Sequence, residues 1–445
     1  MTENSLTQGS IFKKLFALAI PIMGTSFVQM AYNMIDMIWV GKLGSGAVAA
    51  VGTAGFFTWL AMAFIIIPKV SAEVGVAQAV GKKDMDEARV YIKHSIQLII
   101  FLALTYAFIL LTFRKSLVGF FNLGDEEVIN STITYLVIIA LGLVFYFINP
   151  VFSAIFNGYG DSKTPFRINV IGLVINMILD PLLILGIGPF PRLEVAGAAI
   201  ATIIAQIIVT IIFIIKARKR NELFSNLDLL GKPDRNHMNK ITKLGFPVAL
   251  QSAFFTIIGM VLARIIADWG TVAIAVQKVG SQIESISWMT AGGFETAMST
   301  FTGQNYGAKE WDRVRRGYFT GIAIVSCIGI IATILLIFGA QPIFMVFIQE
   351  EEAVRYGVDY LRILGVSQLF MCIEIATTGA FNGLGRTIPP SVVGIVFNLS
   401  RIPLALFLSS TSLGLNGVWW AISISSVFKG SFLCIWYIIS LKKIK

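Results

Sequence analysis

The sequence predicts an all-α membrane protein with twelve transmembrane helices in two six-helix bundles. Three observations support this fold class. Of the 445 residues, 56% are hydrophobic and 13% are charged, which is about half the charged share of a soluble domain. Apolar segments of spanning length recur along the whole chain between short polar breaks. Local motifs of the first half also return in the second half at a nearly constant spacing.

The apolar segments are continuous, whereas a β-barrel would show short alternating segments. Backbone groups cannot stay unpaired in lipid, so each segment is expected to be a helix. We place the twelve spans at 11–40, 46–77, 91–113, 131–156, 165–188, 195–216, 241–267, 272–302, 318–347, 355–381, 390–410 and 415–440.

Lysine and arginine are unevenly shared between the two sides of these spans. The N-terminus, the loops after even-numbered spans and the C-terminus hold 24 of them, and the opposite loops hold 5. The positive-inside rule therefore predicts a multi-pass protein of the inner (plasma) membrane with both termini in the cytoplasm. The same distribution accounts for the net charge of +10 without nucleic acid as a partner.

Two motifs recur between the halves. Residues Gln78–Lys83 match Gln304–Lys309 at an offset of 226, and Phe156–Gly160 match Phe381–Gly385 at an offset of 225. Six spans in each half start both halves on the same side, so the repeat is parallel, with pseudo-twofold symmetry along the membrane normal.

The domain boundaries follow from the longest polar stretch in the middle of the chain. We expect an N-terminal bundle over 1–216, a cytoplasmic linker over 217–240 and a C-terminal bundle over 241–445. Such halves can enclose a cavity that opens alternately to either side, which favours a transporter over a scaffold. The glycine-rich turns lack the Lys-Ser/Thr of a phosphate-binding loop, so an ATP-driven pump is disfavoured.

Two acidic residues lie inside spans of the first half, where ionisable groups usually mark ion or substrate pathways. Asp36 is in span one and Asp180 in span five. Asn176 lies four residues before Asp180 and shares its helix face. Pro181 cannot donate a hydrogen bond, which loosens the backbone there. These groups suit a proton or cation site, although each Asp could instead cap a helix end or pair with a buried base.

The second half lacks both acids, because Leu262 and Ile402 stand at the matching positions. The coupling chemistry is therefore expected in the first half alone. We interpret most charges in the spans of the second half as structural interhelix pairs, for example Glu374 with Arg401. These charges are Arg264, Lys278, Glu284, Glu295, Glu374 and Arg401.

Over nearly its whole length the chain resembles the multidrug and toxic compound extrusion (MATE) family. The similar motifs are Pro21 and Asp36 of span one, the turns Gln78–Arg89 and Asn157–Asp161, and Asn176–Pro181 of span five, which is the most specific. The acidic pair in the first bundle is similar to the DNA-damage-inducible-protein-F-like branch. Span seven has no acid, so the second-bundle sodium site of the other bacterial branch is not carried over.

The resemblance implies an antiporter, not an enzyme, that exchanges H⁺ or Na⁺ for amphipathic, often cationic, drug-like compounds. It implies no other cofactor, and a monomer in membrane lipid would suffice. It also implies bending at the proline of span one, Pro21, with Pro181 as a second hinge candidate. The coupling network that it implies is Asp36, Asp180, Asn176, Thr202 and Tyr135, and a bound Na⁺ would lie at Asp36, Asn176, Asp180 and Thr202.

Two other functions remain open. A flippase for a lipid-linked or polysaccharide precursor belongs to the same superfamily, but such relatives often have more spans and a more basic cavity. A membrane-embedded enzyme would need a converging His/Asp or Ser/His set at one depth. The two histidines, His94 and His237, lie in loop regions, which disfavours that class. The sequence does not decide between sodium and proton.

Overall fold

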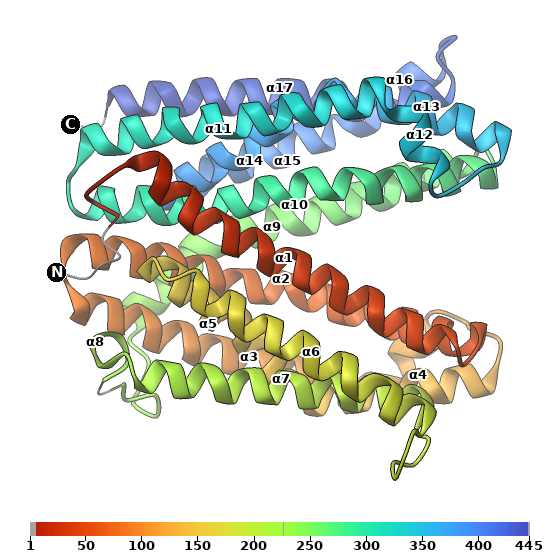
Figure 1. Cartoon of the computed structure of the whole chain (residues 1–445), viewed down its shortest axis with the longest axis horizontal. Coiled ribbons are helices and arrows are strands. Elements are labelled where there is room, and N and C mark those ends of the chain that lie inside the picture. The colour runs from red at the N-terminus through yellow and green to blue at the C-terminus, as the bar shows by residue number, and fades with distance from the viewer. Residues whose placement is uncertain (1–5, 226, 444–445) are drawn as a thin grey trace. The chain divides into compact units, whose positions relative to one another are not determined.

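The computed structural model describes residues 6–225 and 227–443, and every regular element in that part of the chain is a helix (Figure 1). The helices of the first half are α1 (Ile11–Gly41), α2 (Ser45–Lys82), α3 (Met85–Gly119), α4 (Glu126–Leu141), α5 (Leu143–Tyr159), α6 (Lys163–Leu185), α7 (Glu194–Arg218) and the short α8 (Asn221–Phe224). The helices of the second half are α9 (Arg235–Ala267), α10 (Thr271–Gly307), α11 (Trp311–Phe338), α12 (Ala340–Met345), α13 (Glu351–Gly365), α14 (Gln368–Gly383), α15 (Ile388–Leu399), α16 (Arg401–Ser409) and α17 (Leu415–Lys442).

These helices confirm the predicted all-helical membrane fold. Within the described residues, nine segments are long and apolar enough to cross a membrane, and eleven if each of two bent helix pairs is one span. The remaining predicted span is α10, a helix of 37 residues that carries Lys278, Glu284 and Glu295. The twelve predicted spans are thereby all accounted for.

The two bent spans are a feature that the sequence did not predict. Helices α4 and α5 meet at 53° around Gly142, and α13 and α14 meet at 49° around residues 366–367. They are the fourth and tenth spans, which are equivalent in the repeat. Both apolar runs continue through the bend, so hydropathy carries no trace of it.

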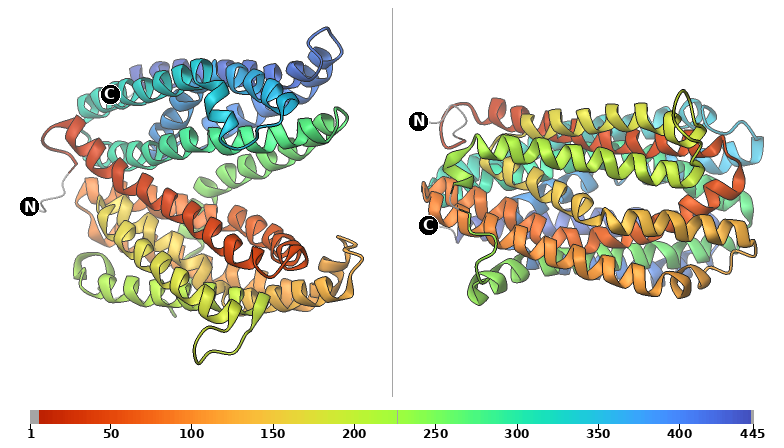
Figure 2. Two further views of the ribbon diagram at one scale, coloured as in Figure 1. Left: turned by 45° about the vertical axis from the view of Figure 1, so that its right-hand side comes forward. Right: turned by 90° about the horizontal axis from the view of Figure 1, so that it is seen from below.

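The chain divides into two compact units. The N-terminal unit is Gly24–Gly245, and the C-terminal unit is Met1–Met23 together with Phe246–Lys445. Helix α1 is continuous in Figures 1 and 2, yet its first residues belong to the C-terminal unit. The compact units are defined by contacts between residues, whereas the six-helix bundles were defined by their membrane spans. The bundle boundaries drawn from the sequence therefore stay a prediction.

Each of the two helices that pass from one unit to the other carries a proline beside the crossing. Pro21 lies in α1 just before the boundary after Met23, and Pro247 lies in α9 just after the boundary at Gly245. The two prolines are 226 residues apart, the offset of the repeat. Proline removes one backbone hydrogen bond from a helix, so both crossings are locally loosened.

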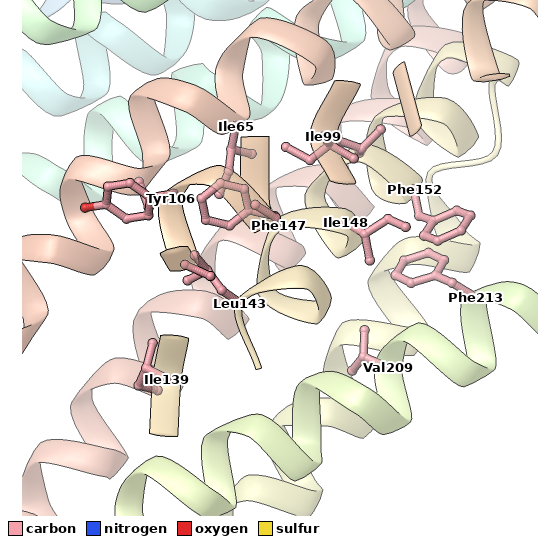
Figure 3. Packing of buried hydrophobic residues seen from close by; sticks show 14 of the residues in the cluster. Ile65, Ile99, Tyr106, Ile139, Leu143, Phe147, Ile148, Phe152, Val209 and Phe213 are labelled. Carbon is pink, nitrogen blue, oxygen red and sulfur yellow. The ribbon is translucent and has the colours of Figure 1, made fainter. Parts of the chain in front are cut away.

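An aromatic and aliphatic core holds the N-terminal unit together (Figure 3). Phe152 of α5 stacks on Phe213 of α7 with ring centroids 5.5 Å apart. The hydroxyl of Tyr106 in α3 donates to the carbonyl of Phe57 in α2 at 2.8 Å, so its polar end is also satisfied. Four helices thus pack around one cluster, which fixes the positions of the helices that carry the polar residues described below.

The same close helix contact occurs in both units and confirms the internal repeat. A Cβ atom on Gly158 of α5 would lie 2.5 Å from the carbonyl oxygen of Glu73 in α2. A Cβ atom on Gly383 of α14 would lie 2.4 Å from the carbonyl oxygen of Ser299 in α10. Only glycine permits this approach of two backbones.

A second contact recurs with its residue types exchanged. In the N-terminal unit Gly75 of α2 lies under the ring of Tyr91 in α3, whereas in the C-terminal unit Gly317 of α11 lies under the ring of Phe301 in α10. Both glycine–aromatic pairs occupy equivalent positions, at an offset of 226. Both halves therefore have the same space between these two helices, but the ring that fills it comes from α3 in the first half and from α10 in the second.

We expect Gly158→Ala to destabilise the protein, because the added methyl group must push α5 away from α2. Overpacking of this kind costs about 1–3 kcal/mol. The control is Gly52→Ala in α2, where nothing lies within 4 Å of the new atom. The melting temperature of the purified protein in detergent should fall for the first variant and hold for the second. Equal melting temperatures would show that the contact is not tight.

Candidate ion-binding site

The two acidic residues predicted from the sequence lie near the ends of their helices. Asp36 is five residues from the end of α1 and is 8% exposed, and Asp180 is five residues from the end of α6 and is fully buried. The C-terminal end of a helix carries the negative end of its dipole. Both carboxylates lie more than one turn before that end, so their burial is the main reason that a bound proton or cation is favoured over a bare charge.

The amide of Asn176 is held against Asp180. Its Nδ2 atom donates to Oδ1 of Asp180 at 2.9 Å, and both side chains are fully buried. The spacing of four residues in one helix places the amide and the carboxylate on one face, as the sequence predicted. Helix α6 continues through Pro181 to Leu185, but Pro181 offers no N–H to the carbonyl one turn earlier.

All five residues of the predicted coupling network are brought together inside the N-terminal unit. Asp36 interacts electrostatically with Asp180. Tyr135 of α4 is buried and interacts electrostatically with both acids. Thr202 of α7 lies beside the hydroxyl of Tyr32, which itself interacts with both acids. Helices α1, α4, α6 and α7 each contribute to one cluster.

Sequence reasoning missed two tyrosines of this cluster. Tyr32 lies four residues before Asp36 in α1, so the helical spacing could have identified it. Tyr146 of α5 interacts with Tyr32 and Tyr135. It follows the bend between α4 and α5, and no local pattern in the sequence places it there.

Three buried carboxylate and amide oxygens of the cluster accept no hydrogen bond from any described residue. They are Oδ1 of Asp36, Oδ2 of Asp180 and Oδ1 of Asn176. Leaving a buried acceptor unpaired costs about 1–3 kcal/mol, and more when it is charged. Carboxylate and amide oxygens suit a hard cation such as Na⁺, and a proton on one carboxylate would serve equally. The donor set therefore fits a small monovalent ion.

The described residues contain no group of three or more His, Cys, Asp or Glu side chains that could hold a metal ion. This agrees with the composition of the cluster, which has two carboxylates and otherwise neutral oxygens. Of the two hinge candidates, Pro181 adjoins Asp180 in the N-terminal unit, and Pro21 belongs to the C-terminal unit.

The charges of the C-terminal unit pair differently from the prediction. Glu374 of α14 forms an ion pair with Lys429 of α17 at 3.2 Å. The predicted partner, Arg401, donates instead to the hydroxyls of Ser425 and Ser426 in α17. The predicted pairing is therefore wrong. Lys429 was overlooked in the last apolar span, and it reaches Glu374 because α17 packs on α14.

Other charges in this unit also have defined partners. Glu284 of α10 accepts hydrogen bonds from the Tyr360 hydroxyl at 2.7 Å and from Nε2 of Gln368 at 2.8 Å. Arg264 forms an exposed ion pair with Asp268, one turn further along the chain. A structural role therefore suits Arg264, whereas Glu284 belongs to a partly buried polar group with Tyr360 and Gln368.

Comparison with known proteins identifies the class. The sequence pattern of the MatE family matches residues 21–182 and again residues 247–407, which places one copy on each half of the repeat. The chain therefore belongs to the MatE family of membrane transporters.

Individual relatives cover almost the whole chain. The probable multidrug resistance protein NorM of Thermotoga maritima is 27% identical over 434 residues, covering 96% of this chain and 92% of its own. An FAD transporter of Shewanella oneidensis is 24% identical, covering 96% of this chain and 94% of its own. A crystal structure of a MATE protein in a bent conformation superposes with a TM-score of 0.92 at 24% identity, covering 100% of this chain and 98% of that one.

We expect both Asp36→Asn and Asp180→Asn to weaken binding of the coupling ion at least tenfold. Each substitution removes one negative charge from the oxygens that face the ion, and the isosteric amide preserves packing. Binding can be measured with radioactive sodium, and separately as proton uptake on a pH step. The control is Asp268→Asn, which removes an exposed carboxylate. Unchanged binding in either site variant would exclude that acid from the site.

Proposed function

We propose that this protein is a secondary active exporter that exchanges H⁺ or Na⁺ for small amphipathic organic compounds, many of them cationic. The observation that supports the proposal is the buried cluster of Asp36, Asn176 and Asp180. Its unpaired oxygens fit a small cation, and it lies in a chain of a transporter family. Relatives such as the NorM-type proteins are named for multidrug resistance.

Coupling follows from competition for the same negative charge. With both carboxylates ionised, the cluster attracts a cationic compound. With a proton or Na⁺ bound, that attraction is lost and the compound is released. A ligand shifts a conformational equilibrium only by its difference in affinity for the two states. The ion must therefore prefer one orientation of the transporter, and the exported compound must prefer the other.

Helix α1 connects the ion site to the conformational change in this proposal. Tyr32 and Asp36 lie on its N-terminal-unit segment, and Pro21 lies on its C-terminal-unit segment. Loading the ion changes the charge balance on the first segment, and the loosened backbone at Pro21 lets that segment bend. A related MATE protein has been crystallised in a conformation described as bent.

The remaining assignments belong to the same proposal. Both termini lie in the cytoplasm of a cell whose plasma membrane holds the protein, as the lysine and arginine distribution indicates. The six-helix bundles are 1–216 and 241–445, joined by the linker 217–240. One chain supplies the complete ion cluster, so the transporter works as a monomer.

The direct test is efflux of ethidium from proteoliposomes under an imposed sodium gradient and, separately, an imposed pH gradient. Wild-type protein should export ethidium under one of them, and that gradient identifies the ion. Asp36→Asn and Asp180→Asn should lower the gradient-driven rate at least tenfold. No efflux under either gradient from folded protein would exclude the exporter and lead to a flippase assay with lipid-linked substrates.

We expect Pro21→Ala to reduce gradient-driven efflux several-fold while expression and melting temperature stay unchanged. The restored backbone hydrogen bond straightens and stiffens α1 where bending is proposed. The control is Pro247→Ala in the repeat-equivalent helix α9, which contains no acidic residue. Efflux by Pro21→Ala at the wild-type rate would count against a hinge at Pro21.

A further inference from the structure

An arginine lies in the middle of a membrane-spanning segment of the C-terminal unit. The span formed by α15 and α16 is Ile388–Ser409, and Arg401 is well inside it and only 8% exposed. Placing an arginine at the centre of a span is costly even by the scale that gives the lowest cost. A charge held there at this cost usually belongs to a substrate or ion pathway.

The guanidinium of Arg401 has only neutral hydrogen-bond partners. Its Nε atom donates to the hydroxyl of Ser425 at 2.8 Å, and one terminal nitrogen donates to the hydroxyl of Ser426 at 3.0 Å. Among residues 6–225 and 227–443, no carboxylate lies within ion-pairing distance of Arg401. A buried charge normally has a charged partner, so the positive charge of this guanidinium is incompletely satisfied.

The two neighbouring acids are already engaged elsewhere. Glu374 forms its ion pair with Lys429, and Glu284 is held by Tyr360 and Gln368. Both carboxylates influence Arg401 electrostatically, but neither bonds to it. The arrangement keeps the acids fixed at a distance and leaves the N–H edge of the Arg401 guanidinium to hydroxyl groups, which can rotate.

We propose that Arg401 binds the carboxylate or phosphate group of an exported compound. An arginine fork accepts two oxygens of such a group in parallel hydrogen bonds, which a hydroxyl pair cannot match in strength. Ser425 and Ser426 then turn to donate to the bound anion. The inference rests on the export function proposed above and extends its substrates from amphipathic cations to zwitterions and organic anions.

A purely structural counter-ion would behave differently. Glu284, Glu374, Arg401 and Lys429 together carry no formal net charge when ionised, so Arg401 could serve only to balance the two acids. Removing it would then destabilise the protein and slow the export of every compound alike. A binding role instead predicts a loss confined to compounds that carry the anionic group.

The test compares two dyes that share one cationic xanthene core. Rhodamine 110 carries a free carboxylate, and rhodamine 123 is its methyl ester. Efflux of each dye from proteoliposomes is measured under the effective gradient for wild type, Arg401→Gln and Arg401→Lys. The control is Arg264→Gln, which removes an exposed arginine of the same unit.

Arg401→Gln should lower efflux of the acid at least tenfold relative to the ester. Arg401→Lys keeps the charge but loses the paired N–H groups of the guanidinium, so its efflux ratio should lie between those of Arg401→Gln and the wild type. Arg264→Gln should leave the ratio of the two dyes unchanged. If the wild type exports the ester but not the acid, this inference is overturned and the proposed export function still stands. An equal loss of both dyes in the Arg401 variants would also overturn it. Export of neither dye by wild type would refute the proposed function itself.

Discussion

The absence of water in the hydrocarbon layer is the constraint on which this structure depends. Backbone groups there must be satisfied within the chain, which makes every described element a helix. The same constraint makes each buried side-chain charge costly, so such charges gather into a few groups. Asp36 and Asp180 lie in one of these groups, and Arg401 and Glu374 lie in another. The scaffold and the proposed chemistry therefore follow from one physical requirement.

The two halves share their packing but not their polar chemistry. The glycine contacts at Gly158 and Gly383 are repeated with the same geometry, while Asp36 and Asp180 correspond to apolar residues in the second half. Packing between helices is satisfied by any residue set of the right shape, so it survives duplication. A binding site is needed once, and the second copy is free to acquire a different set of charges.

Much of the fold could be predicted from the sequence, because helix number and the repeat depend on composition and local spacing. The pair Asn176 and Asp180 was predictable for the same reason, since both lie on one helix face. The bends in the fourth and tenth spans were not, because the apolar runs continue through them. The partner of Glu374 is Lys429, 55 residues away in a span read as uniformly apolar, and only the packing of α17 on α14 brings them together.

The passage of α1 between units also constrains how the protein is made. Leu15 and Leu18 precede the whole N-terminal unit in the chain, yet they are buried in the core of the C-terminal unit. That core is completed by α17, whose Leu433 and Leu441 belong to the same cluster. The segment with Leu15 and Leu18 is therefore synthesised before the helices that bury it. A chain truncated after its first half would retain an unburied core segment, which marks it for recognition by chaperones and proteases.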